Sequence, residues 1–267
     1  MYYADYHAHS NCSFDGNVPM ADMAQAAVAA GLSELCITDH CDMLSVQGER
    51  RFSYDWTPVL AQREQLLARC GGKLALPMGL ELSMSHIDPD AARRILSQPG
   101  LDFVIGSVHN RSEAAGGFDL YYETYANPEL CYQALDDYFS SMEVLAPLDT
   151  YDVLGHIIYP LRYMAVRDGQ AVSLDRYADR IRAILRCAAE HGHGIEVNTW
   201  TGKTVEPWLP VLKFYKDCGG EIVTVGSDAH IPGGVGRGIP QAYGLLAHAG
   251  FRYVTVYRSR KPQFIRI

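Results

Sequence analysis

Two histidines close to the start of the chain, His7 and His9, are separated by a single residue. Tyrosines around them favour an extended strand, in which side chains two positions apart point to the same side. His7 and His9 could therefore bind one metal ion through neutral imidazole nitrogens. Two surface histidines would explain a lone motif of this kind equally well, so the rest of the sequence decides between the two interpretations.

Histidines and carboxylates also follow the predicted strands in the rest of the chain. Short β-type apolar runs alternate with amphipathic helical segments, a pattern that indicates parallel βαβ units. The polar residues that end these runs are His9, Asp39, His40, Glu81, His109, His156, Asn198, Asp228 and His230. Because the carboxyl ends of the strands meet at one rim of an α/β barrel, we expect these side chains to form one site.

The expected order of elements is that of an α/β barrel, because about seven strand–helix units suit a closed barrel better than an open sheet. Strands are predicted at about residues 2–9, 34–38, 73–82, 103–108, 153–156, 194–197, 221–225 and 253–256. Helices are predicted at about 20–30, 58–70, 89–97, 128–144, 173–191, 207–217 and 240–249. Asn127 and Ser173 are expected as N-caps and Gly71 as a helix stop. The polar, glycine-rich stretch 110–125 is long enough to be a substrate loop.

The composition fits one globular domain. The 267 residues are 48% hydrophobic and contain no Pro/Gly/Ser-rich linker or internal repeat, so we expect a single domain over residues 1–267. The net charge of -8 argues against a nucleic-acid partner, which would need a basic face. No apolar run is long enough to span a bilayer, so no membrane contact is expected. The seven cysteines include no Cys-x-x-Cys pair, which favours reduced thiols and a cytoplasmic location.

Six short motifs of this sequence resemble those of the PHP (polymerase and histidinol phosphatase) family, in the same order. They are His7-x-His9, Asp39-His40, Gly79-Leu80-Glu81, Gly106-Ser107-Val108-His109, Gly155-His156 and Gly226-Ser227-Asp228-Ala229-His230. The stretches 196–199 and 251–262 are similar to the histidinol-phosphatase branch of that family. The resemblance covers nearly the whole chain. It implies an α/β fold, a distorted, TIM-like (β/α)7 barrel, with three divalent metal ions at its C-terminal rim.

The resemblance also implies a set of ligands for each ion. The first ion would take His7, His9, Glu81 and Asp228; the second would take Glu81, His109 and His156; the third would take Asp15, His40 and His230. Zinc, manganese and iron are the candidate metals. Some relatives have a histidine in place of Asp15, and a carboxylate oxygen there favours iron or manganese over zinc. Asp39 is expected to orient a ligand histidine through its second ring nitrogen.

Such a centre is suited to the hydrolysis of a phosphate monoester, whose uncatalysed reaction is extremely slow. A hydroxide that bridges two ions would attack the phosphorus atom, since coordination lowers the pKa of water toward neutrality. The resemblance makes L-histidinol phosphate the expected substrate, and hence implies a role in histidine biosynthesis.

Further side chains are candidates for binding this small phosphorylated substrate. They are Arg162, Arg237, Arg111, Tyr121 and Asn198. Arg162 and Arg237 follow metal-bearing strands at the same rim, and arginine offers a planar fork that matches phosphate oxygens. The catalytic candidates are Arg162, Asp228 and His230, the last two as proton donors to the leaving oxygen if they are not fully committed as ligands.

Two other enzyme classes are compatible with parts of the pattern. A PHP phosphoesterase acting on another ester or on nucleotide ends would have the same ligands, although the acidic charge balance argues against nucleic acid. A binuclear amidohydrolase also carries His-x-His on a barrel strand, but Asp15, His40 and His230 argue for a third ion. A non-catalytic role fits poorly with a complete ligand set. No sequence pattern predicts an oligomeric state.

Overall fold

The computed structural model describes residues 1–70 and 72–267, so the helix stop predicted at Gly71 lies outside the described residues. The strands are β1 (Ala4–Asp5), β2 (Glu34–Leu35), β3 (His40–Asp42), β4 (Gly79–Ser83), β5 (Phe103–Ser107), β6 (Val153–Leu154), β7 (Gly194–Asn198), β8 (Val223–Gly226), β9 (Tyr253–Arg258) and β10 (Lys261–Arg266). The α-helices are α1 (Met20–Ala29), α2 (Thr57–Cys70), α3 (Pro89–Leu96), α4 (Pro128–Leu145), α5 (Ala178–Glu190), α6 (Leu209–Asp217) and α7 (Ile239–His248). A π-helix, η3 (Arg162–Arg167), follows β6.

Parallel strands form the centre of the fold. Strands β3 to β8 make one sheet in sequence order, and β1 and β2 make a separate parallel pair. Backbone hydrogen bonds join this pair to neighbouring segments on both sides. On one side the amide of Tyr6, after β1, donates to the carbonyl of Val225 in β8 (2.8 Å), and on the other the amide of Leu35 in β2 donates to the carbonyl of Ala75, ahead of β4 (3.0 Å). These contacts arrange the parallel strands around one centre, so the chain has the α/β, TIM-like fold that was predicted.

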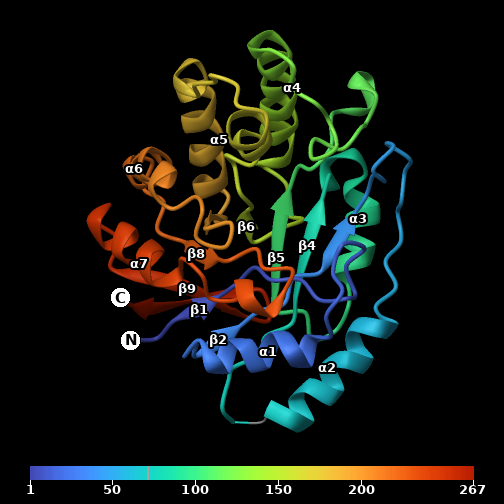
Figure 1. Ribbon diagram of the computed structural model, residues 1–267, viewed down its shortest axis with the longest axis vertical. Coiled ribbons are helices and arrows are strands. Elements are labelled where there is room, and N and C mark those ends of the chain that lie inside the picture. Colours follow the sequence, from blue (N-terminus) through green and yellow to red (C-terminus); the bar gives the residue numbers. More distant parts are fainter. Residues whose placement is uncertain (71) are drawn as a thin grey trace.

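Helices surround the barrel on its outside (Figure 1). In α5, the buried residues Ile181, Ile184 and Leu185 recur at helical spacing and form the face that packs inward. Asn127 caps α4 as predicted, because its side chain accepts a hydrogen bond from the amide of Leu130 (3.0 Å). Within residues 1–70 and 72–267, no helix combines the length and the apolar character that a bilayer crossing requires.

Some element boundaries differ from the predicted ones. The first strand covers only Ala4–Asp5, and the strand predicted from residue 73 begins at Gly79, because regular pairing is confined to these short stretches. Helix α5 begins at Ala178 and not near 173, so the prediction of Ser173 as its N-cap is wrong; the Ser173 hydroxyl accepts from the amide of Asp175 (3.1 Å), and a 3-10 turn with Leu174 as its N-cap precedes α5. The sequence pattern also misses β10, whose side chains are mostly exposed and lack the apolar alternation of a core strand.

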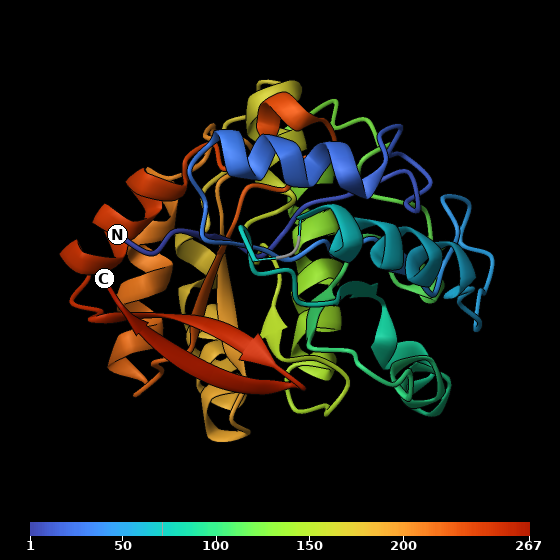
Figure 2. The ribbon, with the colours of Figure 1, turned by 90° about the horizontal axis from the view of Figure 1, so that it is seen from below.

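The C-terminal hairpin of β9 and β10, red in Figure 2, lies against the N-terminal ends of the barrel strands. Tyr257 of β9 packs in one buried cluster with Tyr6 and Phe103, which belong to the first barrel segment and to β5. The turn of the hairpin is bound to the start of β5, where the amide of Arg260 donates to the carbonyl of Asp102 (2.9 Å). The hairpin therefore covers the end of the barrel opposite to the rim that carries the predicted ligands.

A buried carboxylate ties the hairpin to the first strands. Glu34 of β2 is fully buried, and the guanidinium of Arg258 donates to both of its oxygens (2.6 and 2.8 Å). The hydroxyls of Tyr2 and Tyr6 also donate to Glu34. A carboxylate that is cut off from water is stable only when partners of this kind compensate for its lost hydration.

Replacing Arg258 with Met should lower the free energy of unfolding by about 2–3 kcal/mol, because Glu34 would stay buried without its charged partner. Urea denaturation followed by circular dichroism measures the change. The control is Arg252→Met, at an exposed arginine of the same region, which should shift stability by less than about 0.5 kcal/mol. Equal stabilities of the two variants would contradict this role of the ion pair.

Candidate metal centre

The predicted ligands gather at the C-terminal rim of the barrel. They are His7 and His9 after β1, Asp15 in the loop beyond, His40 in β3, Glu81 in β4, His109 after β5, His156 after β6, and Asp228 and His230 after β8. The exposed fraction of the side chain rises from 0% at His7 to 32% at His230 and 36% at Asp15. The cluster therefore extends from the barrel interior to the mouth of the site.

Two backbone features at the end of β8 bring Asp228 to the centre. Gly226 passes so close to His7 that a Cβ atom added there would lie 2.3 Å from the Cβ of His7, so only glycine fits. Asp228 has a φ of 57°, in a left-handed region that costs non-glycine residues about 1–3 kcal/mol. Its amide donates to the carbonyl of His7 (2.7 Å) and holds this conformation. Strain of this kind is typical of functional sites.

Two of the predicted ligand sets form compact groups that share one carboxylate. In each group the ligand atoms lie within 4.8 Å of one another; the groups are His7, His9 and Glu81, and Glu81, His109 and His156. Asp228 lies next to the first group, with its Oδ1 3.5 Å from His7 Nε2 and 3.3 Å from His9 Nε2. Glu81 thus lies between two sets of imidazole nitrogens.

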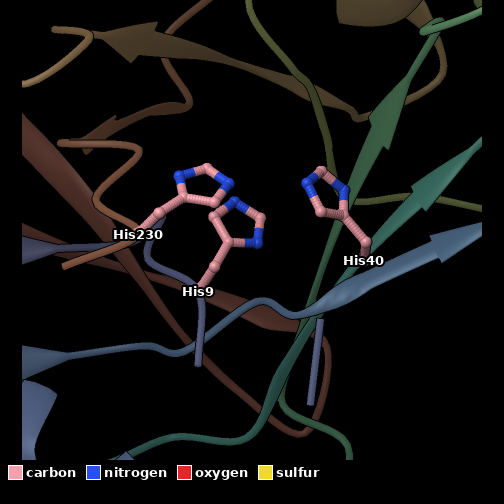
Figure 3. A group of neighbouring side chains, drawn as sticks. All are labelled: His9, His40 and His230. Carbon is pink, nitrogen blue, oxygen red and sulfur yellow. The ribbon is translucent and has the colours of Figure 1, made fainter. Parts of the chain in front are cut away.

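A third group has His9 at its middle, with His40 and His230 on either side (Figure 3). The ring centroids of His40 and His230 each lie 4.2 Å from that of His9. Asp15 Oδ2 lies 3.0 Å from His230 Nε2 and 3.6 Å from His40 Nε2. The structure thus brings Asp15, His40 and His230 together and places His9 beside them.

Hydrogen bonds determine which ring nitrogen of two histidines faces the centre. His7 Nδ1 lies 2.6 Å from Glu196 Oε1, and His109 Nδ1 lies 3.0 Å from Asp42 Oδ1. An ionised carboxylate can only accept a hydrogen bond, so each Nδ1 carries a proton. The Nε2 atom of each neutral ring then presents a lone pair to the centre, which is the arrangement typical of metal-ligating histidines.

These lone pairs face other acceptors at short range. His109 Nε2 lies 3.1 Å from Glu81 Oε1 and 3.4 Å from His156 Nε2, and His7 Nε2 lies 3.2 Å from Glu81 Oε2. The Nε2 atom of His9 is buried and has no hydrogen-bond partner in the described part of the chain. Facing lone pairs repel one another unless a proton or a cation lies between them. Imidazole nitrogens and carboxylates are ligands for Zn²⁺, so the residues present fit divalent metal ions.

The electrostatics of the centre favour the same interpretation. Burial alone would lower the pKa of His7, yet Glu196 and Glu81 raise this pKa well above its usual value. Burial would likewise raise the pKa of Glu81, but the surrounding histidines hold it well below its usual range. The cluster therefore requires positive charge, which metal ions supply when the histidines are neutral.

Among the described residues, Asp39 is connected to the second ring nitrogen of a histidine through a serine and not by a direct bond. Its Oδ1 accepts hydrogen bonds from the amide of Ser10 (2.6 Å) and from the hydroxyl of Ser13 (2.8 Å). The same Ser13 hydroxyl lies 3.2 Å from His9 Nδ1. The turn at residues 10–13 therefore separates Asp39 from the ring, and Asp39 orients His9 through a serine.

A cavity of about 340 Å³ lies beside this cluster of ligands. Its aromatic wall consists of Phe14, Tyr121, Tyr122, Tyr159, Tyr163 and Trp200. Arg162 also lines the cavity although it is only 4% exposed. Its guanidinium donates to Asp228 Oδ2 (2.6 Å) and to Asn198 Oδ1 (2.5 Å). The cavity is thus lined by side chains that could bind metal ions, by a guanidinium held in place and by aromatic rings.

The other predicted substrate-binding residues differ in their positions. Tyr121 lines the cavity, whereas Arg111, Arg237 and Asn198 are not among its lining residues. Arg111 is bound to two acidic side chains at 2.9 and 3.2 Å, and Arg237 is exposed to solvent. Asn198 is buried and positions Arg162. Direct contacts of these residues with a substrate stay predictions.

Sequence reasoning missed some residues that the structure places at the centre. Asp42 and Glu196 bind Nδ1 atoms of ligand histidines, and Asp119 lines the cavity. Asp42 comes two positions after His40 in β3, and Glu196 comes two positions before Asn198 in β7. Because side chains two positions apart share one face of a strand, this spacing could have been used to predict that both carboxylates lie at the site. No comparable pattern marks Asp119.

Comparisons with known proteins agree with this geometry. The family model of the PHP domain matches residues 5–200. The histidinol-phosphatase of Lactococcus lactis is 27% identical over 266 residues, which cover 96% of this chain and 95% of the relative. A probable histidinol-phosphatase of Deinococcus radiodurans is 29% identical over 277 residues, covering 97% and 98%. A crystal structure of the Lactococcus lactis histidinol phosphate phosphatase, complexed with zinc, L-histidinol and phosphate, matches with a TM-score of 0.82 and 25% identity over 98% of both chains. The chain therefore belongs to the PHP domain family.

Proposed function

We propose that this chain is a metal-dependent phosphomonoesterase that hydrolyses L-histidinol phosphate to L-histidinol and phosphate, a reaction of histidine biosynthesis. The observation that carries the proposal is the position of metal-type ligands and a buried arginine on the wall of one cavity. Relatives named histidinol-phosphatase align over nearly the whole chain. A solved relative that shares the fold is complexed with zinc, L-histidinol and phosphate. These findings support both the reaction class and the substrate.

The enzyme holds three divalent ions in this proposal, with zinc, manganese and iron as the candidates. The first is bound by His7, His9, Glu81 and Asp228, the second by Glu81, His109 and His156, and the third by Asp15, His40 and His230. The carboxylate of Asp15 favours iron or manganese in the third position. When bound, such ions lower the pKa of water enough to supply a nucleophile and neutralise the charge on phosphoryl oxygens.

Arg162 binds the phosphoryl group. Its guanidinium is held by Asp228 and Asn198, so little side-chain freedom is lost when a phosphate arrives. Arginine has five N–H donors, and these two bonds leave others for phosphate oxygens. The guanidinium also lies over the ring of Trp200, 5.4 Å from its centroid, which keeps it on the cavity wall.

Asp228 and His230 serve as ligands in this scheme. Oδ1 of Asp228 faces His7 and His9, and Oδ2 accepts from Arg162. Nδ1 of His230 lies 3.2 Å from the backbone carbonyl of Asp228, which leaves only Nε2 to face Asp15. Every polar atom of the two side chains is thus engaged. We therefore favour metal binding over proton donation for both residues.

The proposed activity predicts that the purified chain, supplied with Zn²⁺ or Mn²⁺, releases phosphate from L-histidinol phosphate. The value of kcat/KM should exceed that for glycerol 3-phosphate or glucose 6-phosphate by at least about 100-fold, because a site built for the polar groups of one alcohol rejects esters that lack them. A colorimetric phosphate assay measures all three substrates. Similar rates on the three esters would contradict the substrate, and no release from any of them would contradict the reaction class.

The variant Glu81→Gln should lose the ions that Glu81 contacts, because a neutral amide would replace the carboxylate between two groups of histidines. The affinity for Zn²⁺ should fall by more than about 100-fold, the upper range for losing an outer partner of a metal ligand. Isothermal titration calorimetry of the metal-free protein measures this affinity. Glu64→Gln, at an exposed residue of α2, is the matched control. Equal zinc affinities of the two variants would show that Glu81 is not a ligand.

A further inference from the structure

The loop of residues 110–125 places a carboxylate, that of Asp119, on the wall of the cavity. Asp119 is only 6% exposed. Its amide donates to the carbonyl of Val46 (3.1 Å), and its backbone pairs with that of Asn110. Its Oδ1 accepts a hydrogen bond from the amide of Tyr121 (2.7 Å). The carboxylate is therefore held in position before any ligand binds.

Asp119 lacks a cationic partner within residues 1–70 and 72–267. No Lys, Arg or His nitrogen lies within 4.0 Å of its oxygens, whereas Asp42, Asp137 and Asp228 each have such a partner. No described residue donates a hydrogen bond to its Oδ2, and Asp119 is in none of the groups of metal-type ligands. Because a buried carboxylate without a cation is costly, this position favours a positive group that comes from outside the protein.

Aromatic rings line the same cavity and strengthen this preference. Tyr121 packs edge to face against Tyr163, with centroids 5.2 Å apart, and Tyr163 packs in the same way against Tyr159 at 5.0 Å. Aromatic faces attract cations, and Tyr159 and Tyr163 are each only 7% exposed. An ion pair formed in such surroundings is stronger than one in bulk solvent, because the local dielectric constant is lower.

The cavity wall therefore carries opposite charges at separate points. The guanidinium of Arg162 contacts Asp228, and it does not come within 4.0 Å of Asp119. A complementary ligand needs an anion for Arg162 and for bound metal ions, and a cation for Asp119. L-Histidinol phosphate has this composition, because a primary ammonium group sits on the carbon next to the phosphorylated one. Simple phosphate esters such as glycerol phosphate lack the cation.

We propose that Asp119 binds the ammonium group of the substrate and thereby selects phosphates of amino alcohols over phosphate esters without a cation. This inference rests on the proposed function, since it assigns the residue that recognises the alcohol part of that substrate. The contact is a charge-assisted N–H···O hydrogen bond. Losing a bond of this type weakens binding by about 10- to 100-fold.

The test compares Asp119→Asn with the parent enzyme on two substrates. Asparagine keeps the size of the side chain and an oxygen for the amide of Tyr121, but it removes the charge. The kcat/KM for L-histidinol phosphate should fall about 10- to 100-fold, mainly through a higher KM. The kcat/KM for 4-nitrophenyl phosphate, which has no cation, should stay within about twofold of the parent value. Asp175→Asn, at an exposed residue, should match the parent on both substrates.

Three other results of this experiment would contradict the inference. Equal losses on both substrates would show that Asp119 supports the fold or the metal centre, and would overturn the inference. An unchanged KM for L-histidinol phosphate in an active Asp119→Asn enzyme would also overturn it, while leaving the proposed function intact. A parent enzyme that hydrolyses 4-nitrophenyl phosphate but not L-histidinol phosphate would refute the proposed substrate, and the inference would fall with it.

Discussion

The site depends on one buried negative charge. Glu81 is 1% exposed, and imidazole nitrogens surround it, with His156 Nε2 2.8 Å from Oε1 and His7 Nε2 3.2 Å from Oε2. Removing a carboxylate from water costs several kcal/mol, and only positive charge at short range restores that loss. Because outer carboxylates hold the protons of His7 and His109 at Nδ1, the inner nitrogens face Glu81 as lone pairs. This arrangement of acceptors therefore fits cations placed between these atoms, as the proposed metal ions would be.

The rest of the fold serves to hold this arrangement. The C-terminal hairpin covers one end of the barrel through the buried pair of Glu34 and Arg258, and the other end carries the ligands. Glu196 connects residues from two segments at the C-terminal rim of the barrel. Its Oε1 lies 2.6 Å from His7 Nδ1, and its Oε2 accepts a hydrogen bond from the amide of His156 (3.0 Å). Outer contacts of this kind orient metal ligands and are needed for full metal affinity.

Most of the predicted ligands follow parallel strands, whose carboxyl ends must meet at one rim, so their convergence follows from the alternation of strands and helices. Asp15 lies in a loop and was predicted only through the resemblance to the PHP family, and Asp42 and Glu196 were missed although they lie on strands. Asp119 and Tyr163 come from a long loop and a π-helix, where no period links sequence position to direction. Ser173 was predicted as a helix N-cap, but a 3-10 turn at Asp175–Tyr177 intervenes before α5 begins at Ala178, because residue type alone does not specify whether a turn is 3-10 or α.

Anomalous X-ray diffraction from crystals of the metal-loaded protein, recorded on both sides of the zinc, iron and manganese absorption edges, can locate and identify each ion. We expect three anomalous peaks at the barrel rim, two of them in contact with Glu81 and the third in contact with Asp15, His40 and His230. Metal–ligand distances of about 2.0–2.2 Å should connect the peaks to these side chains. A protein with its histidines and Glu81 joined only by hydrogen bonds, and with no anomalous peak among them, would contradict the account.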